Sequence, residues 1–177
     1  MSKKFIVFFT VILTALALVA MNAVSEEAEK KEEESKPAHD YVGAKKCKIC
    51  HKVEYNSWLE TGHAGAYDLL TDEEKKKPEC GECHITGTTK KDELVEGVQC
   101  EACHGPGGDY KSPKIMSKKK WAADPETYKA MAIEAGLVYP TEETCTGCHR
   151  EEGNPNFKPF DFEKSKGKVH SMSSEEE

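Results

Sequence analysis

The chain has 177 residues, a formal net charge of −7 and a hydrophobic content of 37%, against roughly 45–50% in a typical globular domain. The length allows one folded domain with tails, but so polar a chain buries too little apolar surface to offset the entropy lost on folding. Nucleic acid is excluded as a partner because its phosphates require a basic face. We therefore expect something other than side chains to fill the interior.

Residues 1–25 have the pattern of a secretory signal peptide. Two lysines form a charged start, Phe5–Ala20 is apolar, and Ala23–Ser25 offers small residues for cleavage. The alternative is an uncleaved membrane anchor, since the apolar stretch is just long enough to span a bilayer. We therefore expect export to the periplasm or the cell exterior, with membrane association if the segment is retained.

The rest of the chain divides into three parts. Residues 26–40 are expected to form a charged, disordered linker, because they are rich in Glu and Lys and have no apolar stripe. A solvent-exposed helix is the alternative for this segment. The folded domain then spans residues 41–170, and residues 171–177 form a polar tail.

The first half of the domain contains two helical signals. The composition of Ala44–Leu59 allows a helix over this whole range. Thr71 and Glu74 have the spacing of a capping box ahead of a short basic helix, which Pro78 would stop.

The second half contains three helical signals. Asp124-Pro125 predicts an N-cap with proline at the first helical position, and this helix would run to Ala135 with Gly136 as its C-cap. Thr141 is a cap for another short helix, and Asp161–Lys166 predicts one more. Since no convincing strand alternation occurs, the predicted fold is mostly α, with short helices and long loops.

Four Cys-x-x-Cys-His motifs lie in the domain. They consist of Cys47, Cys50 and His51; Cys80, Cys83 and His84; Cys100, Cys103 and His104; and Cys145, Cys148 and His149. Two thiols three positions apart lie on one side of a helical turn and can add to the two vinyl groups of one haem, and the histidine then lies beneath the iron as proximal ligand. The eight cysteines fill the four motifs with none left over. Four covalently bound c-type haems are therefore the predicted cofactors, around which the chain would wrap.

Three other readings of paired cysteines are weaker. Zinc sites do not need a histidine directly after each second cysteine. Disulfides are compatible with an exported chain but leave the histidines unexplained. Thioredoxin-like redox pairs require a βαβ context that the sequence lacks.

The supply of distal ligands is short. Four irons need up to four distal ligands, and the chain has only three further histidines, His39, His63 and His170. At most three haems can therefore have two histidine ligands from one chain. The fourth iron is ligated by methionine, open, or completed by a neighbouring molecule.

Four residues are candidate distal ligands. His63 lies twelve residues beyond His51, or about 18 Å along a continuous helix, whereas axial nitrogens on one iron lie about 4 Å apart. His63 is therefore expected to serve a different haem, unless the chain reverses between the two. His170 and His39 are the other histidine candidates, with a tail residue and a solvated residue as the respective alternatives. Met116 follows a glycine-rich turn that could return it to a haem face, or it fills a gap in the packing.

The residues around the motifs carry a further pattern, in Val42–His51, Tyr55–Trp58, Thr61–Ala64, Gly97–Gly107 and Val169-His170. In these stretches the chain resembles the cytochrome c-554 family of tetrahaem cytochromes, over about residues 41–170. The resemblance implies a mostly α fold with closely stacked haems, one of them five-coordinate, and His63 and His170 as distal ligands. The family's further histidine after Gly-Pro-Gly is absent here, where Gly108–Lys111 has no histidine. Met116 and His39 are the candidates to replace it.

The predicted function is electron transfer between redox partner proteins rather than catalysis, because an iron with two protein ligands has no site for a substrate. One alternative is reduction of a small nitrogen or oxygen species at an open five-coordinate haem. Another is a subunit of an extracellular cytochrome filament. Lysines 75–77 and 118–120 are either docking sites for an acidic partner or solvated surface. The sequence does not specify the electron donor or acceptor.

Overall fold

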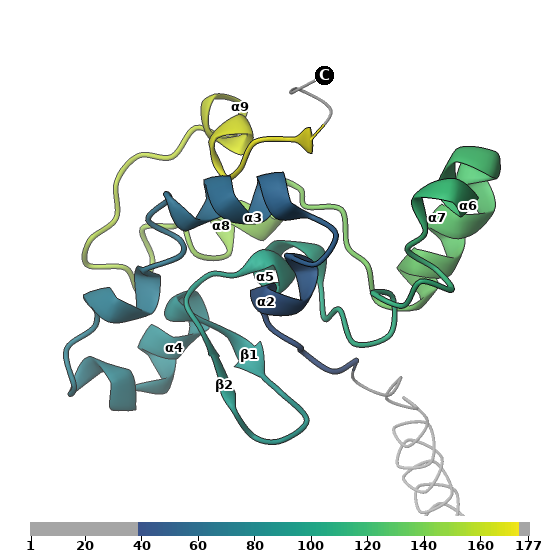
Figure 1. Ribbon diagram of the computed structural model, residues 1–177. Coiled ribbons are helices and arrows are strands. Elements are labelled where there is room, and N and C mark those ends of the chain that lie inside the picture. Colours follow the sequence, from purple (N-terminus) through teal and green to yellow (C-terminus); the bar gives the residue numbers. More distant parts are fainter. Residues whose placement is uncertain (1–38, 174–177) are drawn as a thin grey trace, which may run out of the picture. The chain divides into compact units, whose positions relative to one another are not determined.

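The computed structural model describes residues 39–173, so the predicted signal peptide and most of the predicted linker lie outside the described residues. Short helices joined by long loops dominate this part of the chain (Figure 1), and the predicted fold class is confirmed. The α-helices are α2 (Ala44–Cys47), α3 (Lys52–Leu59), α4 (Pro78–His84), α5 (Cys100–His104), α6 (Lys118–Ala123), α7 (Pro125–Glu134), α8 (Glu142–Thr146) and α9 (Phe162–Ser165). Three 3-10 helices, η1 (Ala66–Leu69), η2 (Glu74–Lys76) and η3 (Lys166–Lys168), and two strands, β1 (Ile85–Thr88) and β2 (Leu94–Glu96), complete the elements. None of the helices found between residues 39 and 173 is long and apolar enough to cross a membrane.

The three capping signals of the second half of the domain are confirmed. The Asp124 carboxylate accepts a hydrogen bond from the Thr127 N–H at 3.2 Å at the start of α7. Thr141 forms a capping box with Thr144 at the start of α8. The Asp161 carboxylate accepts from a backbone N–H in the first turn of α9. These side chains satisfy donors that have no partner within the helix.

In the first half, the capping box of Thr71 and Glu74 ahead of a short basic turn is confirmed, but the expectation of one long helix is wrong. The helix expected over Ala44–Leu59 is broken into α2 and α3, because His51 leaves the helical region with φ −109° and ψ 61° and the chain turns there. Pro78 does more than end the basic turn η2, since it also starts α4 at a position where its missing N–H costs nothing.

A small hairpin that sequence reasoning missed follows α4. Strand β1 pairs antiparallel with β2, with Gly87 opposite Val95 and Thr88 opposite Leu94, and the register shifts between Ile85 and Gly87. Strands of three and four residues are too short to show a clear alternation of polar and apolar residues in the sequence.

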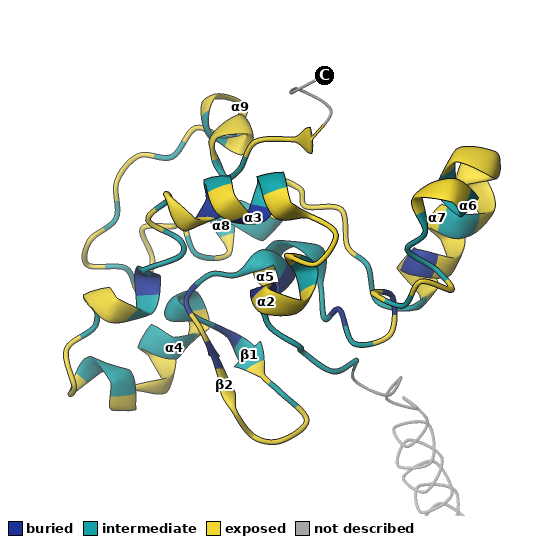
Figure 2. Cartoon of the chain, viewed as in Figure 1, coloured by how far each residue is buried: buried dark blue, intermediate teal, exposed yellow. Residues whose placement is uncertain are grey.

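The side-chain core is small. Figure 2 shows few buried positions, most residues being intermediate or exposed. Ala44, Tyr55 and Trp58 form the main buried cluster, and the Trp58 indole N–H donates to the Val98 carbonyl at 2.9 Å. This cluster packs α3 against the segment that leads into α5. A core of this size is what the low hydrophobic content of the chain predicts.

One buried carboxylate connects α5 to the chain that leads into α2. Glu101 is 1% exposed, and its two oxygens accept hydrogen bonds from the backbone N–H groups of Val42 at 3.0 and 3.1 Å, Gly43 at 2.7 Å and Gly107 at 2.6 Å. Hydrogen bonds to a charged group contribute about 1.5–3 kcal/mol each. Beside them, the Gln99 side-chain oxygen accepts from the Ala44 N–H at 2.6 Å. Side chains around α5 therefore set the position of the start of α2.

We predict that Glu101→Gln lowers the free energy of unfolding by about 2–4 kcal/mol, because the new amide NH₂ would face backbone N–H donors in a buried site. Denaturant unfolding followed by far-UV circular dichroism measures this loss. The control is Glu82→Gln, since Glu82 also lies between the two cysteines of its motif but is exposed. It should change stability by less than about 1 kcal/mol. Equal stabilities for the two variants would contradict the role assigned to Glu101.

Candidate haem-binding sites

The four Cys-x-x-Cys-His motifs all contain one helical turn. We call them motif 1 (Cys47–His51), motif 2 (Cys80–His84), motif 3 (Cys100–His104) and motif 4 (Cys145–His149). Motifs 2 and 3 lie wholly within α4 and α5. Motif 1 starts on the last residue of α2 and motif 4 starts within α8. In both of these the histidine N–H still donates to the carbonyl of the first cysteine, at 3.0 and 2.9 Å respectively. This turn places two thiols and an imidazole as haem attachment requires.

Thiols of different motifs lie side by side. Cys47 of motif 1 is hydrogen bonded to Cys100 of motif 3, which raises the pKa of the Cys47 thiol far above its ordinary value and lowers the pKa of Cys100. Burial raises the pKa of Cys148 in motif 4 to about 12, and a hydrogen bond to Cys83 of motif 2 contributes to this rise.

Motif 3 also lies near motif 4. Burial raises the pKa of Cys103, and the nearby charge of Cys145 raises it further. Cysteines of motifs 1 and 3, of motifs 3 and 4, and of motifs 4 and 2 are therefore neighbours. None of the eight cysteines forms a disulfide. Within residues 39–173 no group of three or more His, Cys, Asp or Glu side chains is placed to hold a metal ion by itself.

Two motif histidines face a histidine from elsewhere in the chain. The ring centroids of His63 and His149 lie 6.0 Å apart with an interplanar angle of 62°. Those of His104 and His170 lie 6.3 Å apart at 43°. Two imidazoles that bind one iron from opposite sides, each with a metal–nitrogen distance of about 2 Å, have ring centroids about 6 Å apart. Both pairs therefore fit a haem iron held between them.

Hydrogen bonds around α3 hold the two facing histidines in place. His63 lies in the turn after α3, and its carbonyl accepts from the Val98 N–H at 3.0 Å. His170 follows η3, and the next residue, Ser171, donates its N–H to the Ser57 hydroxyl at 2.8 Å. The polar tail is therefore docked on α3 over its described residues.

Backbone carbonyls orient several of the imidazoles. Nδ1 of His84 donates to the Ala66 carbonyl at 2.5 Å, Nδ1 of His104 to the Val138 carbonyl at 3.4 Å, and Nδ1 of His170 to the carbonyl of the next residue at 3.0 Å. A carbonyl only accepts, so each Nδ1 carries the proton. Nε2 is then the nitrogen with a lone pair available for a metal.

Burial favours the neutral form of the His63 and His104 imidazoles. It lowers the pKa of His63, which nearby His149 lowers further, and it lowers the pKa of His104. The neutral imidazole is the form that binds a metal, so both rings are available at neutral pH. The Phe160 ring stacks on His149 with centroids 4.5 Å apart and an interplanar angle of 17°, which restricts the rotation of that imidazole.

The structure does not bring the other two candidate ligands next to a motif histidine. His39 is hydrogen bonded through Nδ1 to Oδ2 of Asp109 at 2.7 Å, and its Nε2 is buried without a hydrogen-bond partner. Met116 lies in the turn before α6, where its backbone N–H donates to the Ser112 carbonyl. In the described part of the chain, no hydrogen bond or ring contact joins its thioether to a motif.

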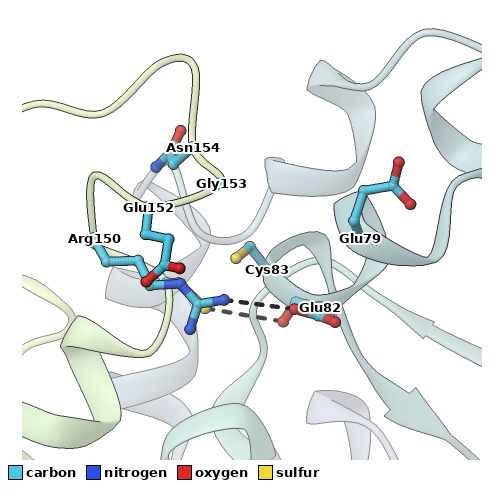
Figure 3. Close-up of a pocket in the computed structure, with 8 residues that line it drawn as sticks. Glu79, Glu82, Cys83, Arg150, Glu152, Gly153 and Asn154 are labelled. Atoms are coloured by element: carbon cyan, nitrogen blue, oxygen red, sulfur yellow. Dashed lines mark hydrogen bonds and ion pairs between the residues drawn. The ribbon is translucent and has the colours of Figure 1, made fainter.

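A cleft of about 370 Å³ lies between motif 2 and the segment that follows motif 4 (Figure 3). Its lining consists of Glu79, Glu82, Cys83, Cys148, Arg150, Glu152, Gly153 and Asn154. Arg150 and Glu82 form an ion pair across it, with nitrogen and oxygen 3.6 Å apart. The volume is in the range of small-molecule and cofactor sites, and two attachment thiols lie on its walls.

Sequence reasoning missed the groups that orient the candidate ligands. Ala66 and Val138 act through backbone carbonyls, which every residue has, so no sequence signal could have marked them. Asp109 lies 70 positions from His39, and only the folded chain brings the two together.

Comparisons with known proteins find similar chains among the cytochromes. The family model described as "Cytochrome c554 and c-prime" matches residues 46–105. The chain is 29% identical over 141 residues to cytochrome c-554 of Nitrosomonas europaea, an alignment that covers 65% of this chain and 60% of that protein. The chain therefore spans less than two thirds of the length of this relative.

A solved structure, the reduced state of cytochrome c554 from Nitrosomonas europaea, shares the fold with a TM-score of 0.51 and 24% identity, over 78% of this chain and 81% of that one. The cofactors expected from the sequence are supported as well, since this relative is a c-type cytochrome and four haems are consistent with it. The family model, the relative and the shared fold all agree with the resemblance to the cytochrome c-554 family.

Proposed function

We propose that this chain is an exported electron carrier that holds four c-type haems along one continuous row of attachment sites. The observation that carries the proposal is the separation of about 6 Å between the imidazoles of two histidine pairs, which fits iron with both axial positions filled. When bound, the haems would supply one-electron oxidation and reduction.

The residues have distinct roles in this proposal. The eight cysteines of the four motifs would hold the haems through thioether bonds, and His51, His84, His104 and His149 would be the proximal ligands. His63 would be the distal ligand at motif 4, and His170 the distal ligand at motif 3. Carbonyl partners on Nδ1 would keep the imidazoles oriented, which is the usual second shell of a metal-binding histidine.

Filled axial positions favour an electron carrier over an enzyme. An iron that is ligated on both sides by the chain has no position for a substrate. His63 and His170 are each far in sequence from the motif histidine they face, so each pair also joins distant segments. Such joints would limit movement between oxidation states, which suits a carrier that exchanges electrons repeatedly.

The spatial order of the motifs supports transfer through the protein. Neighbouring thiols of motifs 1 and 3, motifs 3 and 4, and motifs 4 and 2 support a row in the order 1, 3, 4, 2. Electrons could then enter at one end of this row and leave at the other, to redox partner proteins. Residues 1–25 would direct export, with the periplasm or the cell exterior as the location.

A second candidate function is reduction of a small nitrogen or oxygen species at an open iron. The observation that favours it is that His51 and His84 face no second histidine ring among the described contacts. An iron at either motif with one free axial position could bind a small ligand.

We predict that the intact mass of protein matured in a host with c-type haem assembly exceeds the mass of the processed chain by four haems, with residues 1–25 removed. Thioether bonds survive denaturation, so mass spectrometry under denaturing conditions measures both. Replacing Cys80 and Cys83 by alanine should remove one haem and leave three. Haem lost on denaturation, or a mass without four haems in the parent protein, would overturn the attachment model.

We predict that His63→Ala and His170→Ala each convert one low-spin ferric haem to a high-spin one, because each removes one axial ligand. The double variant should convert two. Electron paramagnetic resonance of the oxidised protein counts these species, and Leu69→Ala, which trims an exposed side chain, is the control. An unchanged low-spin count in either single variant contradicts the assigned pairing.

We predict that the fully reduced protein donates four electrons per chain to an outer-sphere acceptor, one from each haem, and shows no sustained turnover with nitrite, nitric oxide or hydroxylamine. Stopped-flow spectroscopy measures the first property and product analysis the second. Multiple turnovers with one of these species would favour the reductase instead.

A further inference from the structure

His39 has the hydrogen bonding of a metal ligand. Its side chain is 19% exposed, and Nδ1 lies 2.7 Å from the Asp109 carboxylate. Nε2 is the one buried side-chain nitrogen or oxygen in residues 39–173 that has no hydrogen-bond partner. Leaving such an atom without a partner costs about 1–3 kcal/mol, so a bound group on Nε2 is the expected explanation.

Gly136 fixes the position of the His39 ring. A Cβ atom at Gly136 would lie 2.7 Å from Cδ2 and 2.9 Å from Cγ of the ring, and the glycine has φ +102°. The imidazole therefore occupies space that only a glycine leaves free. With Asp109 on Nδ1 and Gly136 against the ring, little freedom remains for this side chain.

The chemistry of the pair is that of a carboxylate–histidine–metal site. The Nδ1–H of His39 donates a hydrogen bond to the Asp109 carboxylate. Nε2 therefore carries the free lone pair. Metal-binding histidines commonly donate their second ring nitrogen to a carboxylate, which orients the ring and makes it a stronger donor. This feature is absent from the carbonyl-bonded rings of His84, His104 and His170.

The number of histidines and the position of His39 in the fold indicate which iron His39 would bind. Of the seven histidines, four belong to the motifs, and two more face motifs 3 and 4. His39 is the last one, for motif 1 or motif 2. The segment of His39 runs beside the loop after α5, where the Asp40 carbonyl accepts from the Gly108 N–H at 2.9 Å, and it leads directly into α2 and motif 1.

The carboxylate lies on the side of motifs 1 and 3. Asp109 precedes Tyr110, a buried residue close to Cys47 of motif 1 and Cys100 of motif 3. Motif 2 instead lies next to Ala66 and motif 4. Since His170 already faces motif 3, motif 1 is the site left for the pair.

We propose that His39 is the second axial ligand of the iron held at motif 1 and that Asp109 is its positioning residue. The inference rests on the proposed function, since it requires the four haems. It leaves motif 2 as the one site without a second histidine, so the iron at His84 is the open one.

The test uses the mature holoprotein, with the four haems first verified by intact mass. Wild-type protein should show three low-spin haems and one high-spin haem by electron paramagnetic resonance. His39→Ala should show two of each. Met116→Leu, which removes the rival ligand, should leave the wild-type count unchanged.

Asp109→Asn tests the positioning role. The variant should keep three low-spin haems but raise the reduction potential of one of them, because a neutral amide makes the imidazole a weaker donor. Asp72→Asn, a change at an exposed carboxylate, should leave all four potentials unchanged.

Each outcome decides the matter. A wild-type low-spin count in His39→Ala with four haems present overturns the inference, as does a loss of low-spin signal in Met116→Leu. Unchanged potentials in Asp109→Asn overturn the role of the carboxylate. A wild-type mass without four haems overturns the proposed function itself, and the inference with it.

Discussion

The arrangement of the sites depends on one buried carboxylate. Glu101 lies between the two cysteines of motif 3, yet its side chain turns inward and accepts hydrogen bonds from the backbone on both sides of it in the sequence. Removing a charge from water is costly unless it is paired or fully hydrogen bonded, and here backbone N–H groups satisfy it. The result is that residues 42–43 lie against α5, which brings Cys47 next to Cys100 and His39 next to Asp109.

A chain with so small a core needs other connections between its segments. The facing histidines supply them in the proposed holoprotein, because each pair joins the loop after α3 or the end of the domain to a distant motif. Exposed apolar residues fit the same picture: Ile49, inside motif 1, is 71% exposed, as expected of a side chain that a haem would cover. Cofactors would then take the place of the missing apolar core, consistent with the low hydrophobic content.

The groups on the second ring nitrogen divide the histidines into two kinds. His84, His104 and His170 donate Nδ1–H to backbone carbonyls, whereas His39 donates to a carboxylate. A charged acceptor makes an imidazole a stronger donor and stabilises the oxidised metal. In the proposed row of attachment sites, motif 1 lies at one end and motif 2 at the other. The two ends would thus differ most in ligation, one having a carboxylate-supported ligand and the other an open position.

The amino-acid sequence by itself determined the number of attachment motifs, since thioether chemistry needs residues that are adjacent in the chain. It also determined the helix starts at Asp124, Thr141 and Asp161, because caps act within a few residues. Only the tertiary structure decided that His63 faces motif 4 and His170 motif 3, and that Glu101 is buried. It also decided the break at His51 and the short hairpin, which local propensity was too weak to indicate. A distal ligand approaches the metal from the side opposite the motif histidine. It can therefore come from any distance along the chain, and the spacing of residues in the sequence does not predict which residue it is.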